Sequence, residues 1–137
     1  MSYKRAVLIE IQWDRTLRRL KPMKHSIIKD KSFTFALRII TISRKLREQK
    51  EYELSRQILR SGTSIGSNVE EALAAISRPE FAAKMCIASK EARESSYWLR
   101  LLRDSKVTPS STIDPLVQEC AELIRILTSI VKTSQGR

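Results

Sequence analysis

A run of small residues that keeps helical spacing constrains this chain more than any other feature. Residues 61–67 contain two glycines and three serines, a composition typical of a loop. The larger apolar residues on both sides nevertheless recur at steps of three, four and seven, which indicates one face of a helix; they are Leu54, Ile58, Ile65, Val69, Ala72 and Ile76. Each glycine inside a helix costs roughly 1 kcal/mol relative to alanine. We therefore expect that another helix approaches this one closely, within the chain or from a second subunit.

The rest of the chain also favours helices. Only three glycines and four prolines occur in 137 residues, and most of the others are good helix formers. The first segment is expected to start at Asp30 or Ser32, either of which can cap it, and to end at Glu48. Its broad apolar face contains Phe33, Ala36, Leu37, Ile39 and Ile40. The second segment covers residues 52–75 and contains the small-residue run.

The third segment has the clearest start signal. Ser77 is followed by Pro79 and Glu80, which is a capping box with proline in the first turn. Its apolar and small positions are Phe81, Met85, Ala88, Ala92, Ser95, Leu99 and Leu102. A polar linker at 104–112 follows, and the fourth helix is expected to begin at Asp114–Pro115. Its apolar positions are Leu116, Val117, Cys120, Ile124, Leu127 and Val131, and residues 133–137 are expected to fray.

Four helices joined by short turns predict an all-α, antiparallel, up-down-up-down four-helix bundle over residues 23–137. Residues 1–22 differ in character, because they hold six basic and two acidic residues. This segment is either a basic amphipathic arm or an extension upstream of a start at Met23, and we favour the second interpretation.

Catalytic chemistry finds little support in the sequence. Cys86 and Cys120 lie in helical patterns without metal-ligand spacing, so we expect buried, reduced thiols in a cytoplasmic protein. His25 is the single histidine and is expected to be a solvent-exposed bystander. No glycine-rich phosphate loop with lysine occurs, and no apolar run is long enough for a membrane span. We expect no enzyme activity, no metal and no cofactor.

The net charge of +11 points to an anionic partner. The charge is spread over the chain, which fits contacts to nucleic-acid phosphates better than reading of bases. The candidate residues for nucleic-acid binding are Arg38, Arg44, Lys45, Arg47, Arg56, Lys84, Arg100 and Arg103.

Two polar stripes border the apolar faces of the second and third helices. The first contains Arg60, Ser64, Asn68 and Glu71, and the second contains Lys90, Arg93, Glu94, Tyr97 and Arg100. Such stripes form either solvated flanks or a polar network at a helix or subunit junction. Tyr97 and the neighbouring Trp98 suit an interface, the core or, less well, base stacking.

These motifs resemble a known family. Lys31–Phe33, the run from Arg60 to Ala72, and the run from Lys90 to Leu99 are similar to the bacterial four-helix-bundle proteins encoded in intervening sequences of 23S rRNA genes. The resemblance covers residues 23–132, and Ser67, Glu70 and Leu73 are mild departures from it.

The resemblance implies a homo-oligomer, in the form of a barrel-like pentamer, without enzymatic activity. It also implies a relation to accessory proteins of diversity-generating retroelements, which are basic pentamers that engage nucleic acid and a reverse transcriptase. The candidate motif and subunit-contact residues are Arg60, Gly62, Ser64, Gly66, Asn68, Glu71, Arg93, Glu94, Tyr97 and Trp98. We expect a basic oligomer that binds structured RNA; the alternative is a protein-interaction scaffold, for example an accessory subunit of a reverse transcriptase.

Overall fold

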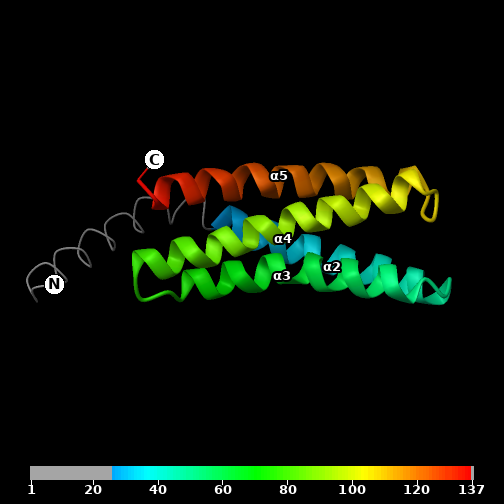
Figure 1. Ribbon diagram of the computed structural model, residues 1–137, viewed down its shortest axis with the longest axis horizontal. Helices are drawn as coiled ribbons and strands as arrows, with labels where there is room; N and C mark the ends of the chain where they lie inside the picture. The colour runs from blue at the N-terminus through cyan, green and yellow to red at the C-terminus, as the bar shows by residue number, and fades with distance from the viewer. Residues whose placement is uncertain (1–25, 137) are drawn as a thin grey trace, which may run out of the picture.

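The computed structural model describes residues 26–136, which form four helices and no strand. The helices are α2 (Ser26–Glu48), α3 (Tyr52–Leu73), α4 (Arg78–Asp104) and α5 (Ser110–Ser134). Consecutive helices lie side by side and run in opposite directions (Figure 1). The predicted up-down-up-down bundle is therefore confirmed. The expectations for residues 1–22 and for His25 lie outside the described residues.

The helices do not contact one another equally. α3 packs extensively against α2 and α4, and α4 packs equally well against α5, whereas the contact between α2 and α5 is much smaller. α2 and α4 therefore occupy diagonal positions in the bundle. The interface between α2 and α5, called the seam below, is the least extensive of the four interfaces between adjacent helices.

α2 begins earlier than predicted, so the expectation that Asp30 or Ser32 caps it is wrong. The helix already includes Ile28, which is fully buried in the core. Ser32 is buried inside the helix, and its hydroxyl donates to the carbonyl of Lys29 at 3.1 Å. Burial of Ile28 explains why the helix extends beyond the local capping signal.

The start of α5 is also earlier than the predicted Asp114–Pro115. The amides of Thr112 and Ile113 donate to the carbonyl of Pro109, which precedes the first helical residue. Ile113 is fully buried, so the added turn anchors the helix in the core. The linker shortens accordingly to residues 105–109, and Pro115 lies inside the helix.

The end of α5 is more ordered than the predicted fraying of residues 133–137 suggests. Ser134 is the last helical residue and is buried. The guanidinium of Arg78, at the start of α4, donates to the carbonyls of Thr133 and Ser134. Arg78 thus supplies hydrogen bonds to carbonyls that a helix end leaves without intrahelical partners.

α4 follows its prediction closely. Ser77 precedes the helix, and its hydroxyl accepts a hydrogen bond from the amide of Glu80 at 3.2 Å. The Glu80 carboxylate accepts one in return from the amide of Ile76. All seven predicted inward positions are buried: Phe81, Met85, Ala88, Ala92, Ser95, Leu99 and Leu102.

Three apolar residues that the periodicity assigned to helix faces are exposed. On α2, Phe35 and Ile39 are buried, whereas Phe33 and Leu37 are 62% and 52% exposed. α2 has apolar residues on more than one side. Phe35 and Ile39 lie on the side that packs into the core, whereas Phe33 and Leu37 lie on a side that faces outward. Ile76 lies beyond the end of α3 and is exposed as well.

The small residues of α3 bring α2 close. A Cβ atom added to Gly62 would lie 2.8 Å from both γ carbons of Ile39, closer than real side chains approach. A Cβ on Gly66 would lie 3.5 Å from the carbonyl oxygen of Ser32, an ordinary contact. The close approach inferred from the sequence therefore occurs between two helices of one chain.

Buried polar contacts link each pair of consecutive helices. The hydroxyls of Ser43 in α2 and Ser55 in α3 lie 2.7 Å apart. The hydroxyl of Ser95 in α4 donates to that of Ser61 in α3 at 3.0 Å. The thiol of Cys120 in α5 donates to the carbonyl of Ala92 in α4. Because a buried polar group must find its partner, each contact favours one register of the two helices.

Candidate functional site

An ion-pair network joins the family-like motifs of α3 and α4. The guanidinium of Arg60 pairs with the carboxylate of Glu94 and lies 3.3 Å from that of Glu91. The hydrogen bond to Glu94 raises the pKa of Arg60. Burial raises the pKa of Glu91 above its ordinary value, although Arg60 opposes this shift. Arg60 and Glu94 therefore contribute to a polar network between two helices of the same chain.

The other polar residues of the α3 motif serve the bundle locally. The Ser64 hydroxyl donates to the carbonyl of Arg60, and the Asn68 amide donates to the carbonyl of Ser64 at 2.8 Å. Glu71 pairs with Lys84 of α4 at 2.9 Å. With Gly62 and Gly66 turned toward α2, most of this motif is engaged in packing within the chain.

Tyr97 and Trp98 are consecutive residues of α4 with different surroundings. Their rings meet edge to face, with centroids 5.2 Å apart. Trp98 is half-buried and packs on the core, and its indole N–H has no hydrogen-bond partner among the described residues. Tyr97 is 49% exposed. The structure thus separates the two rings into one that supports the core and one available at the surface.

Half of the cations predicted to bind nucleic acid have carboxylate partners. Arg38 pairs with Glu119 and Arg56 with Glu53. Lys84 pairs with Glu71, as described above, and Arg103 contacts Asp104 and Asp114. Residues 26–136 hold 18 basic and 13 acidic residues, so they carry less than half of the net charge of +11. For nucleic-acid binding, the location of the cations without carboxylate partners is therefore more informative than the net charge.

The remaining four predicted cations gather at one end of the bundle. Arg44, Lys45 and Arg47 lie in the last two turns of α2, and Arg100 lies one turn before the end of α4. Both helices end at the same end of the molecule (Figure 1). All four side chains are exposed and pair with no carboxylate of residues 26–136. We call these four residues the bundle-end cations.

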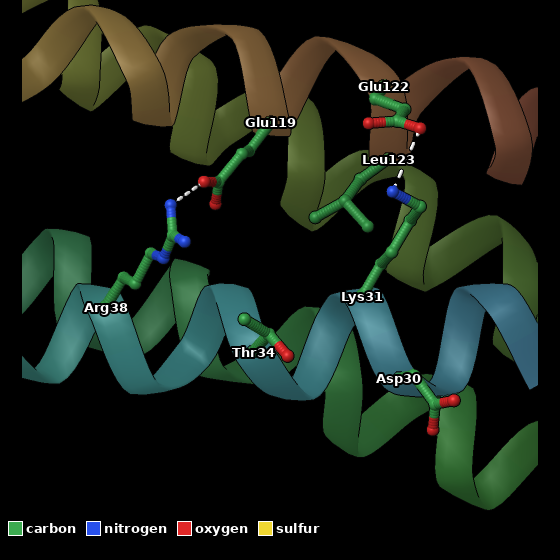
Figure 2. Close-up of a pocket in the computed structure, with 7 residues that line it drawn as sticks. All are labelled: Asp30, Lys31, Thr34, Arg38, Glu119, Glu122 and Leu123. Atoms are coloured by element: carbon green, nitrogen blue, oxygen red, sulfur yellow. Dashed lines mark hydrogen bonds and ion pairs between the residues drawn. The ribbon is translucent and has the colours of Figure 1, made fainter.

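A pocket of about 320 Å³ occupies the seam between α2 and α5. Figure 2 shows Lys31 and Arg38 reaching from α2 toward Glu122 and Glu119 on α5, with Leu123 between the two pairs. The Lys31–Glu122 distance is 3.0 Å. Asp30 and Thr34 complete the lining. With three carboxylates and two cations, this pocket is unsuited to an anionic ligand.

A second groove, of about 590 Å³, lies between α4 and α5 and has the opposite character. We call it the α4–α5 groove. Its charged lining residues are Arg93 of α4 and Arg125 and Lys132 of α5, and no carboxylate is among the described residues that line it. Arg125 and Lys132 were not predicted to bind a partner, because isolated cations on a helix look like ordinary surface residues.

Two exposed apolar stripes lie on the diagonal helices. The α2 stripe contains Phe33 and Leu37, one helical turn apart, and the α4 stripe contains Ile87, Tyr97 and Leu101. Exposed apolar residues one turn apart, such as Phe33 with Leu37 and Tyr97 with Leu101, are typical of interaction sites in soluble proteins. Of these residues, only Tyr97 was a candidate contact from the sequence.

The described residues offer no obvious metal site. No group of three His, Cys, Asp or Glu side chains within residues 26–136 is arranged to hold a metal ion. Cys120 is buried and Cys86 is half-buried, so the expectation of burial holds only for Cys120. In the same part of the chain, no helix has the length and apolar character needed to cross a bilayer.

Comparison with known proteins agrees with these motifs. The profile of the family described as 23S rRNA-intervening sequence protein matches residues 24–129. A crystal structure from Bacteroides thetaiotaomicron, of a protein of unknown function from the S23 ribosomal protein family, is 45% identical in sequence. It superposes with a TM-score of 0.77 over 80% of this chain and 99% of its own. None of the curated proteins matches the chain.

Proposed function

The chain belongs to the 23S rRNA-intervening sequence protein family, and on this premise we propose that it is a non-enzymatic, homo-oligomeric protein that binds structured RNA through phosphate contacts. The observation that carries the proposal is the set of bundle-end cations. A cytoplasmic location and the lack of a cofactor remain predictions from the sequence.

The bundle-end cations are suited to phosphates for two reasons. They are exposed and free of carboxylate partners within residues 26–136, so they can bind phosphate without first breaking an ion pair. They also come from two helices, α2 and α4, so they present charge over the width of the bundle rather than along one helix. Such contacts position a nucleic acid without reading its bases.

The two apolar stripes support self-association. They lie on diagonal helices and differ in composition, so one stripe on each copy can contact the other stripe on the next copy. Contacts between two different surfaces are heterologous, and they generate rings when the rotation closes. The family resemblance supplies the expected order, a pentamer. The alternative function is a scaffold in which the exposed α2 stripe, Phe33 and Leu37, binds another protein.

The test compares two doubly neutralised variants in binding to a structured RNA hairpin. Arg44→Gln/Arg47→Gln removes two bundle-end cations. The control, Lys29→Gln/Lys90→Gln, removes two exposed cations that line neither the α2–α5 pocket nor the α4–α5 groove. These two lysines also lack carboxylate partners in the described residues. The slope of log affinity against log salt is negative, and each lost phosphate contact reduces its magnitude by about 0.7–0.9.

We expect the magnitude of the slope to be about 1.4–1.8 smaller for the bundle-end variant than for the wild type, and unchanged for the control variant. Equal slopes for the two variants would show that binding does not depend on the bundle end. A captured protein partner together with no RNA binding would favour the scaffold instead.

A further inference from the structure

We propose that the α4–α5 groove is a second phosphate-binding site, which holds the RNA backbone along the side of the bundle. The proposal rests on the RNA-binding function proposed above and extends it from the bundle end to a separate face. Arg93, Arg125 and Lys132 are the residues that would contact phosphate oxygens.

From Glu119 onward, the charged residues of α5 are divided between two flanks of the helix. Glu119 and Glu122 face α2, where they pair with Arg38 and Lys31 across the seam (Figure 2). Arg125 and Lys132 instead line the groove shared with α4. Because Glu119 and Glu122 are held on the far flank by their partners, the groove keeps a positive potential that nearby carboxylates would otherwise cancel. Asp114, the remaining acidic residue of α5, pairs with Arg103 of α4 and does not line the groove.

None of the three cations in the groove is used elsewhere in the described bundle. All are exposed, and none pairs with a carboxylate of residues 26–136. Lys132 lies in the last turn of α5, where the helix dipole alone would favour a cation. Arg125 and Arg93 lie well inside their helices, so the dipole does not account for them.

The dimensions of the groove suit an extended polyanion. Arg125 and Lys132 are seven residues apart on α5, which corresponds to about 10 Å along the helix. Ile124 contributes half-buried apolar surface, and the Thr128 hydroxyl donates to the carbonyl of Ile124 at 2.7 Å. Recognition therefore depends on the cations, and guanidinium groups can bind phosphate with two parallel hydrogen bonds.

The experiment measures binding of the same RNA hairpin to the full chain, to Arg125→Gln/Lys132→Gln, and to the matched Lys29→Gln/Lys90→Gln control. All four substituted side chains are exposed, so the fold should survive, and circular dichroism with light scattering checks that structure and assembly are unchanged. We take the affinities of the wild type and the variant to be equal at about 1 M salt. The loss of two phosphate contacts then lowers the affinity of the variant about 25- to 60-fold at 0.1 M salt.

We expect that loss for the groove variant and wild-type affinity for the control. If the groove variant binds RNA with wild-type affinity while the bundle-end variant binds more weakly, the proposal of a phosphate site in the groove is refuted. The proposed RNA-binding function then stands. An equal loss in the groove variant and the control also overturns it, because the effect would then reflect total charge. Absence of RNA binding by the wild-type protein at low salt overturns both proposals.

Discussion

Ile39 of α2 packs directly against the backbone of Gly62 in α3, at a distance that leaves no room for a side chain on α3. This contact accounts for Gly62 within the small-residue run, the most unusual part of the sequence. A glycine that weakens its own helix is retained because a buried, β-branched residue of the neighbouring helix occupies the space.

The two glycines of α3 should respond oppositely to alanine. Gly62→Ala forces a methyl group against the stiff, fully buried side chain of Ile39, and overpacking of this kind costs about 1–3 kcal/mol. Gly66→Ala meets only an ordinary contact, so the better helix propensity should stabilise the fold by up to about 1 kcal/mol. Urea unfolding of both variants measures the difference, and equal changes of the same sign would contradict the packing argument.

The pH dependence of stability should report on Glu91. Its pKa is raised in the folded state, chiefly by burial. As pH rises, the unfolded chain therefore releases this proton before the folded chain does. The contribution of Glu91 to stability is complete below the ordinary carboxyl pKa, and it is lost as pH rises through the raised folded value.

Glu91→Gln removes this contribution, because glutamine does not titrate. Urea unfolding at a series of pH values should show the variant gaining stability relative to the wild type as pH rises across that window. A difference that stays constant across the window would mean that the folded protein does not shift the pKa of Glu91.

The two cysteines should differ in reactivity. Burial raises the pKa of Cys120 to about 12, so it contributes almost no thiolate at neutral pH, whereas Cys86 is half-buried. Alkylation of the native protein at about pH 8, followed by peptide mass spectrometry, should label Cys86 and spare Cys120. Denaturation should make both react, and equal labelling in the native state would place Cys120 outside the core.

Self-association should depend on the α2 stripe. Leu37→Asp introduces a charge into an exposed apolar surface, so it should reduce the mass found by light scattering toward that of one 15.8 kDa chain. Ile76→Asp is the control, because Ile76 is also exposed but lies outside both stripes. A wild-type protein that is already monomeric would refute the proposed oligomer.

The sequence predicted those elements whose signals are local. The capping box at Ser77 gave the start of α4, and the spacing of its apolar residues gave the buried face. The starts of α2 and α5 were misplaced because no side chain caps α5, and because burial of Ile28 and Ile113 extends both helices beyond local signals. On α2, periodicity could not distinguish Phe33 from Phe35, since apolar residues occupy both faces.

The candidate site was harder to predict, because it depends on which helices are neighbours. The sequence identified Arg60 and Glu94 as candidates on separate helices, but not that they pair or that Glu91 joins them, because these residues lie about 30 positions apart. In the same way, Arg125 and Lys132 gain significance only once Glu119 and Glu122 are seen to face α2.

The salt dependence of RNA binding by the wild-type protein decides whether the chain binds phosphates as proposed. Titration of a structured RNA hairpin from about 50 mM to about 200 mM salt should give a steep negative slope of log affinity against log salt, near −0.7 to −0.9 for each phosphate contacted. A protein that uses the four bundle-end cations and the three cations of the α4–α5 groove, with one phosphate for each cation, should show a slope of about −5 to −6. Undetectable binding at the lowest salt, or an affinity that does not change with salt, would contradict the account.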